Sequence, residues 1–184
     1  ADLVAAARAL SAGAARRPVH ILWVGTGELA TALEAQCEVL HPAGRRQQPN
    51  AGGQSAAVGP AASFVGFLNQ SEIAKAYAAA DCLVLPSDAK ETWGLVVNEA
   101  MACGLACIVS DACGCAEDLV APLRPDLVFP CGDIGGLARS IRAVAGDPPS
   151  SAVLASHIDC YDPLRTVETV EQLYRECTVA SFAG

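Results

Sequence analysis

Short apolar segments alternate with amphipathic segments along most of this 184-residue chain. The apolar segments have the length and nearly unbroken apolar composition of buried parallel strands. We expect strands at 19–24, 63–65, 82–85, 106–109 and 127–129. We expect helices at 1–12, 28–37, 72–80, 95–103, 135–145 and 163–177, and a short one within 111–120. Strands that alternate with helices in this way predict parallel β-α units, and so a doubly wound, Rossmann-like α/β sheet.

Turn-forming residues separate these elements. Ser71 is expected to cap the helix 72–80, and Pro148-Pro149 to interrupt the chain. The segment 41–60 is rich in Gly, Pro, Gln and Ala, which predicts an exposed loop inserted into the domain. Residues 1–177 are therefore expected to form one domain, with 178–184 as a tail. Ligands of such sheets bind beyond the carboxyl ends of the strands, so the loops after the strands are the candidate site.

Composition and charge narrow the functional classes. The hydrophobic fraction is 52% and the charged fraction 17%, a balance that is typical of a globular protein. The net charge is −8, and the basic doublets Arg16-Arg17 and Arg45-Arg46 have no interleaved aromatic residues. Nucleic-acid binding is therefore not expected. The sequence has no apolar run of the roughly 18 residues that a membrane helix needs, and no signal peptide is visible, so we expect a cytoplasmic protein.

The nine cysteines do not have the spacing of a metal site or of a disulfide framework. Cys113 and Cys115 form the one close pair, and no second Cys or His pair near them completes a tetrahedral site. We therefore expect no metal. Free thiols in this number are typical of a reducing compartment.

The segment 86–101 carries the most informative chemistry. It follows a predicted strand and opens a predicted helix near Gly94, whose lack of a side chain lets a ligand approach the backbone. The first backbone N–H groups of a helix and its dipole favour an anion such as phosphate. Glu99 lies about one turn into this helix, and Glu91 precedes it, so both carboxylates can accept hydrogen bonds from polyol hydroxyls. That combination suits a nucleotide-sugar.

The residues alone leave an ordinary alternative open. Glu91 is equally compatible with a surface loop, and Glu99 with the exposed face of an amphipathic helix.

A set of segments in this order is similar to glycosyltransferase family 4, of the GT-B fold. The segments are ILWVGTGELATALE, FVGFLNQSEIAKAYAAADCLVLPS, PSDAKETWGLVVNEAMACGL, CIVSDACGCAEDLV and FPCGDIGGLARSI, and they extend over most of residues 1–177. The central segment contains the spacing Glu91-x7-Glu99 of the family signature. The resemblance implies that this chain is the C-terminal, donor-binding domain of a retaining glycosyltransferase.

The resemblance also implies roles for individual residues. Glu99 would hold the ribose hydroxyls, and Glu91 would contact the transferred sugar and stabilise its developing positive charge. Backbone groups at Trp93, Gly94 and Leu95 would face the sugar and diphosphate. The base would pack on the stretch that contains Val65, Phe67 and Leu68. Gly25 and Gly27 match a family loop. We expect this loop in the first place to be a tight turn, and in the second place to contact the ligand. Asp111 and Asp133 also match family positions, and their expected roles are helix capping and loop anchoring.

The chain also departs from the family pattern. It begins after the strand whose loop supplies an Arg and a Lys to the diphosphate, and it lacks the acceptor-binding N-terminal domain, which we expect in cis or in trans. Lys90 stands where Gly is common, and we hypothesise that it brings positive charge near the phosphates. Contact with a membrane surface would come through the absent half.

The expected reaction is hexose transfer from a UDP- or GDP-sugar to a glycan or lipid-linked acceptor, without a further cofactor. The first alternative is a non-catalytic nucleotide-sugar-binding partner or a fragment without activity. A second is a related enzyme such as a sugar-nucleotide epimerase, which would need catalytic His residues that this pattern does not supply. A third is a doubly wound domain with no sugar chemistry.

Overall fold

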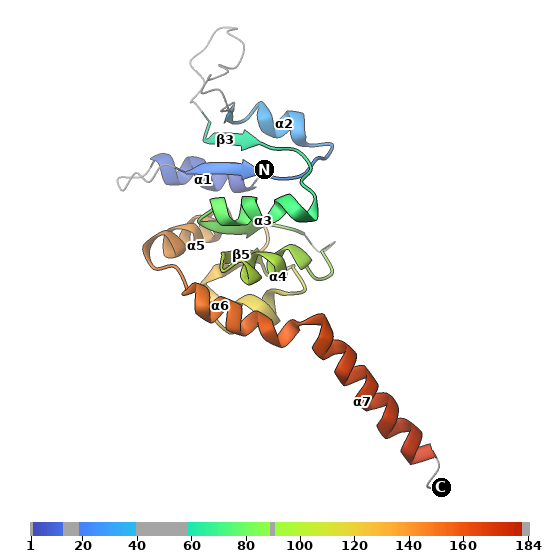
Figure 1. The fold of residues 1–184 in the computed structure, drawn as a ribbon. Helices are drawn as coiled ribbons and strands as arrows, with labels where there is room; N and C mark the ends of the chain where they lie inside the picture. Colours follow the sequence, from blue (N-terminus) through green and yellow to red (C-terminus); the bar gives the residue numbers. More distant parts are fainter. Residues whose placement is uncertain (1, 13–18, 40–58, 89–90, 182–184) are drawn as a thin grey trace, which may run out of the picture.

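The computed structural model describes residues 2–12, 19–39, 59–88 and 91–181. Within them, parallel strands and helices alternate over most of the chain, and the helices α6 and α7 follow α5 without a further strand (Figure 1). The strands are β1 (His20–Trp23), β2 (Glu38–Val39), β3 (Ala61–Phe64), β4 (Cys82–Leu85), β5 (Ala106–Ser110) and β6 (Val128–Phe129). The α-helices are α1 (Asp2–Ala12), α2 (Ala30–Glu34), α3 (Gln70–Ala79), α4 (Leu95–Ala102), α5 (Ile134–Gly146), α6 (Ser151–Ile158) and α7 (Pro163–Ser181). Short helical turns are η1 (Ala116–Val120), η2 (Pro125–Leu127) and η3 (Asp159–Tyr161).

The strands form two three-stranded sheets, in the orders β1-β3-β2 and β4-β5-β6. All pairs are parallel: Ile21 of β1 lies beside Ala62 of β3, and Val84 of β4 lies beside Ile108 of β5. Parallel strands joined by helical crossovers confirm the predicted Rossmann-like α/β class.

The predicted single sheet is divided between β1 and β4. Each of these strands has one hydrogen-bonded neighbour among the described residues, whereas β3 and β5 have two. Burial follows this difference, because every residue of β5 is buried while every residue of β4 is only partly buried. An apolar strand such as Cys82–Leu85 has the composition of a central parallel strand and here lies at a sheet edge.

Helix α1 connects the cores of the two sheets. Ala6 and Leu10 belong to the larger apolar cluster around β5 and α4, while Val4 and Ala7 belong to the smaller cluster around β1 and β3. All four residues are buried, and they lie on one helix. The division of the sheet is therefore bridged by helix packing.

Several boundaries differ from the prediction. The N-cap of α3 is Asn69 and not Ser71: its side chain accepts a hydrogen bond from the Ser71 backbone N–H at 3.0 Å. Helix α6 was not predicted, and it begins directly after Ser150. Helix α2 is shorter than the predicted 28–37, and α7 continues to Ser181, into the predicted tail. Most of the predicted loop 41–60 lies outside the described residues.

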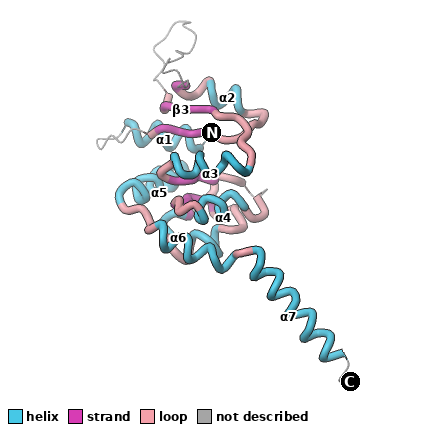
Figure 2. Tube along the Cα trace, in the orientation of Figure 1, coloured by secondary structure: helices cyan, strands magenta, loops and turns pink. Residues whose placement is uncertain are grey.

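The last helix, α7, projects away from the sheets, as the trace in Figure 2 shows most plainly. Its apolar side chains are exposed, Leu164 by 70% and Tyr174 by 73%. In the described part of the chain, none of the helices combines the length and the apolar character that a membrane crossing requires.

Candidate functional site

The start of α4 is shaped by Gly94. This residue has φ +103°, a left-handed conformation that side chains rarely adopt, and it is the N-cap of the helix. A Cβ atom here would lie 2.9 Å from Leu85 Cδ2 and 3.2 Å from Cys115 Sγ. The Val97 N–H donates to the Gly94 carbonyl at 2.8 Å, which closes the first turn. The earlier N–H groups of α4 have no partner within the helix, so their dipoles favour an anion.

The loop before α4 is held by the loop after β5. The Gly114 N–H donates to the Glu91 carbonyl at 3.4 Å, and the Cys115 N–H donates to the Trp93 carbonyl at 3.0 Å. The two backbones are so close at Gly114 that a Cβ atom would overlap the carbonyl oxygen of Thr92. Only glycine allows this approach, and it fixes where Glu91 and Gly94 lie.

Trp93 packs its side chain against the protein. Its indole N–H donates to Asn98 Oδ1 at 2.8 Å, and its ring lies 6.3 Å from that of Tyr161 in η3. The Trp93 side chain is therefore held by the protein, and its backbone carbonyl accepts from the Cys115 N–H.

Along the chain, one predicted carboxylate precedes the helix start and the other lies within the helix. Glu91 is half-buried in the loop, and Glu99 is exposed on α4. Tyr77 Oη donates to Glu99 Oε2 at 2.8 Å from the neighbouring helix α3. The sequence did not single out Tyr77, because the contact joins residues 22 positions apart. Leu95, predicted to face the sugar and diphosphate, is 69% exposed at the first position of α4.

The carboxyl ends of β4, β5 and β6 are tied together. Ser110 Oγ, at the end of β5, donates to the Ser87 carbonyl after β4. The Asp111 N–H donates to the Phe129 carbonyl at 2.9 Å, and Asp111 Oδ1 accepts from the Cys131 N–H at 2.8 Å. These bonds confirm that Asp111 anchors a loop. Asp133 likewise caps α5 by accepting from the Gly136 N–H at 2.9 Å, as predicted.

The other predicted contacts lie at the carboxyl ends of β1 and β3. The Gly25 N–H donates to the Gly66 carbonyl at 2.7 Å, so the two loops are joined through backbone conformations with positive φ. Val65 and Phe67 are exposed by 43% and 78%, whereas Leu68 is partly buried.

Gly27, also predicted at this end, is exposed, and its carbonyl accepts from the Ala30 N–H at the start of α2. Among the described residues, no hydrogen bond joins this set to Glu91 or Glu99. The structure therefore brings the predicted residues to the same ends of the strands in two groups, one on each sheet.

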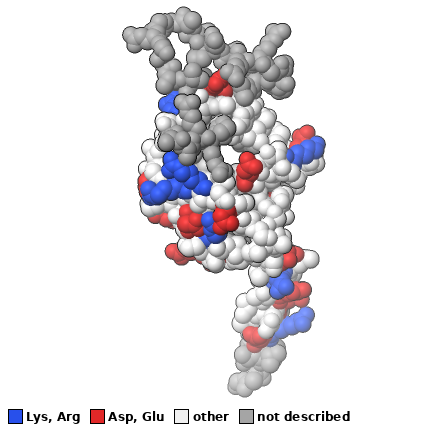
Figure 3. All heavy atoms as spheres, turned by 90° about the vertical axis from the view of Figure 1, so that its left-hand side faces the viewer, with Lys and Arg blue, Asp and Glu red and all other residues white. Residues whose placement is uncertain are grey.

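Among the described residues, the charged side chains next to the helix start include the carboxylates Glu91 and Glu99. Burial raises the pKa of the Cys115 thiol to about 11, with the neighbouring Cys113 and then Glu91 adding to the effect, so this thiol is neutral at physiological pH. Lys90, hypothesised to approach the phosphates, lies outside the described residues. On the face that Figure 3 shows, acidic and basic side chains lie next to one another. Ion pairs such as Arg124–Asp126 and Arg139–Asp133 have this arrangement.

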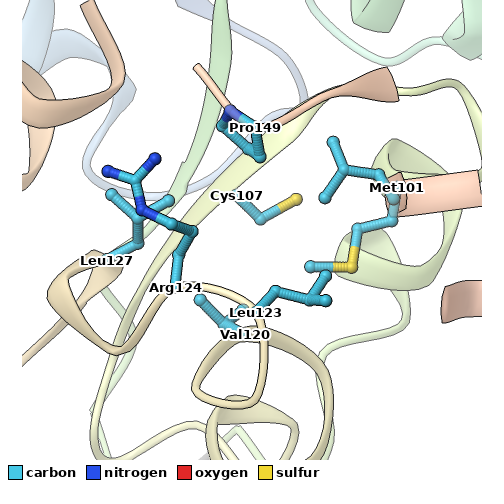
Figure 4. A pocket seen from close by; sticks show the side chains of 8 residues that line it. Met101, Cys107, Val120, Leu123, Arg124, Leu127 and Pro149 are labelled. Carbon is cyan, nitrogen blue, oxygen red and sulfur yellow. The ribbon is translucent and has the colours of Figure 1, made fainter. Parts of the chain in front are cut away.

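Two hollows lie apart from the start of α4. The first is a void of about 10 Å³ beside Met101, Cys107 and Leu123, whose side chains converge in Figure 4. It has room for one water molecule at most. The second is an open hollow of about 320 Å³ between β6 and α5, next to Arg139 and Ser140.

In residues 2–12, 19–39, 59–88 and 91–181, no group of three His, Cys, Asp or Glu side chains is arranged to hold a metal ion. The nine cysteines are all free thiols.

Comparisons with known proteins give the family. The family model described as "Glycosyl transferases group 1" matches residues 46–157, which is more than half of the chain and includes Glu91 and Glu99. The solved structure of sucrose-phosphate synthase from Thermosynechococcus elongatus aligns with a TM-score of 0.52 and 28% identity. The alignment covers 65% of this chain and 31% of that one.

Curated relatives are similar over shorter stretches. A GDP-mannose-dependent alpha-mannosyltransferase of Mycolicibacterium smegmatis is 40% identical over 84 residues, 46% of this chain and 21% of the relative. A 2-deoxystreptamine N-acetyl-D-glucosaminyltransferase of Streptomyces fradiae is 36% identical over 89 residues, 48% of this chain and 20% of the relative. The matched stretch thus spans about a fifth of each relative's length.

Proposed function

The chain belongs to the glycosyl transferases group 1 family, and from this premise we propose that it is the donor-binding half of a retaining glycosyltransferase. The complete enzyme transfers a hexose from a nucleotide-sugar to a glycan or lipid-linked acceptor. The acceptor-binding domain is supplied in cis or in trans, since the matched stretch spans about a fifth of the curated relatives.

The observation that carries the proposal is the start of α4, with Glu91 in the loop before it and Glu99 within the helix. Gly94 is the N-cap of the helix, whose first backbone N–H groups have no partner within it, and the backbone bonds from Gly114 and Cys115 tie down the preceding loop. The diphosphate of the donor would accept hydrogen bonds from these groups and interact favourably with the helix dipole. Such prearranged donors stabilise the negative charge that develops on the leaving diphosphate.

Each carboxylate then has a separate role. Glu99 accepts hydrogen bonds from the vicinal ribose hydroxyls, and the exposed apolar groups Val65 and Phe67 offer a surface for the base. Glu91 accepts from hydroxyls of the transferred sugar and stabilises the positive charge at its anomeric carbon. Lys90 adds charge near the phosphates. The donor itself is the substrate, and no further cofactor takes part.

The relatives keep the choice of donor open. One is named for GDP-mannose and another transfers N-acetylglucosamine, so their names do not agree on a sugar. We propose a UDP- or GDP-sugar.

Calorimetric titration of the chain with GDP, UDP and ADP tests the proposal. We expect one of GDP and UDP to bind with micromolar to low-millimolar affinity. Glu99→Ala should weaken it at least about tenfold, the effect of losing hydrogen bonds to a charged group. Glu168→Ala, which removes an exposed carboxylate from α7, is the matched control and should bind like the wild type. If the Glu99→Ala variant bound the nucleotide as tightly as the wild type, the assignment of Glu99 would be contradicted. If the wild type bound none of the nucleotides, donor binding by this chain would be contradicted.

A further inference from the structure

Tyr77 places a single polar atom at the boundary between the core and the candidate site. The residue lies in the last turns of α3, is 7% exposed and belongs to the larger apolar cluster. Its hydroxyl donates to Glu99 Oε2 at 2.8 Å, across the contact between α3 and α4. The ring is therefore fixed by packing, and its hydroxyl is directed at one carboxylate.

Glu99 is held from one side only. Among the described residues, the hydrogen bond to this carboxylate comes from the Tyr77 hydroxyl, and Oε2 accepts it. Glu99 is an exposed residue, and no hydrogen bond to Oε1 joins it to the described residues. An ionised carboxylate accepts about four hydrogen bonds. Most of this capacity is left for a ligand, while the direction of the carboxylate is already set.

Tyr77 can act in this pair only as a donor. Burial raises the pKa of its phenol well above the usual 10.0, and the hydrogen bond and the charge of Glu99 raise it further. The hydroxyl therefore keeps its proton at any physiological pH. A neutral donor leaves the negative charge of Glu99 in place. A cationic partner would instead neutralise part of that charge.

We propose that Tyr77 is a positioning residue, which orients the Glu99 carboxylate toward the vicinal hydroxyls of a bound nucleotide's ribose. This inference rests on the proposed donor binding. It adds a specific claim, which is that the buried phenol contributes to affinity only through the two ribose hydroxyls. A purely structural Tyr77 would instead support the packing of α3 on α4 without regard to the ligand.

The test compares ligands with and without those hydroxyls. Tyr77→Phe keeps the ring and removes the one donor, so the apolar packing is preserved. The wild type and this variant are titrated with GDP and UDP and with their 2′,3′-dideoxy counterparts. We expect Tyr77→Phe to bind the ribonucleotide roughly three- to tenfold more weakly, which is less than the direct loss of a hydrogen bond to a charged group because the phenol acts through Glu99. The dideoxy ligand should bind both proteins equally.

Two further variants make the outcome decisive. Adding Tyr77→Phe to Glu99→Ala should cause no further loss, because the phenol would have no carboxylate to orient. Tyr174→Phe removes a hydroxyl from exposed α7 and should leave both affinities unchanged.

The opposing results are distinct. Equal weakening of the ribonucleotide and the dideoxy ligand would show a structural role and overturn the inference. Unchanged affinity for both would overturn it as well, while leaving the proposed donor binding intact. A wild type that binds neither GDP nor UDP would instead overturn the proposed function, and with it the role of Tyr77.

Discussion

Substitution of Gly114 by alanine should separate the two loops that shape the helix start. The added methyl group would overlap the Thr92 carbonyl oxygen and would lie 2.9 Å from the Thr92 carbonyl carbon and 3.3 Å from Trp93 Cα. These are backbone atoms, so no side-chain rotation relieves the contact. The loops must move apart, which lengthens the bonds from the Gly114 and Cys115 N–H groups to Glu91 and Trp93.

The magnitude follows from those two bonds. Each backbone hydrogen bond contributes a net of about 0.5–1.5 kcal/mol, so their loss lowers the free energy of unfolding by about 1–3 kcal/mol. Nucleotide affinity should fall roughly tenfold or more, because the helix start and Glu91 no longer hold their positions relative to each other. Urea unfolding followed by circular dichroism measures the first effect, and calorimetric titration measures the second.

Two other glycines provide matched controls. A Cβ atom at Gly59 would overlap the Gln36 carbonyl oxygen, so Gly59→Ala should destabilise the chain similarly without affecting the nucleotide. A Cβ atom at Gly146, at the end of α5, would meet nothing within 4 Å, so Gly146→Ala should preserve both properties. If the Gly114→Ala variant had the same urea midpoint of unfolding as the wild type, the account of the two loops would be wrong.

Alkaline pH and hydrogen exchange give two further predictions. Burial raises the pKa of Cys82 and of Cys115 to about 11, above the usual 9.0, so their contribution to stability is present below pH 9 and is lost as the pH rises towards 11. Thermal unfolding should therefore occur at lower temperature at pH 10.5 than at pH 8, and an unchanged midpoint would refute the burial of these thiols. In β1 and β4, backbone N–H groups that point away from the paired neighbour should exchange with deuterium at least about tenfold faster than those of β5. Equal protection of β4 and β5 in a monomer would show that the edge of β4 is paired.

Sequence patterns predicted the elements that local composition determines. The strand Cys82–Leu85 was predicted at its observed bounds, since it is a short apolar run followed by Pro86-Ser87. The helix at Leu95 was predicted from its start because Gly94 precedes a periodic apolar segment. Helix α6 is not predicted, because Pro148 and Pro149 indicate an interruption of the chain, although the Ser that follows them is a favourable N-cap residue type.

Other features depend on contacts between distant residues. The overlap that requires glycine at position 114 involves Thr92, and the partner of Glu99 is Tyr77 on another helix. Neither contact has a local sequence signal. The division of the sheet between β1 and β4 also depends on which strands meet in space, which periodicity does not specify. The ligand roles of the predicted site residues stay predictions.

Nuclear magnetic resonance mapping of nucleotide binding tests the central claim most directly. The ¹⁵N-labelled chain would be titrated with GDP and with UDP while its backbone amide signals are followed. We predict that the nucleotide that binds causes the largest chemical-shift changes in the backbone amides of residues 65–68 and 91–99, at the carboxyl ends of the strands. Shifts that instead cluster around Arg139 and Ser140, beside the hollow between β6 and α5, would contradict the proposed site.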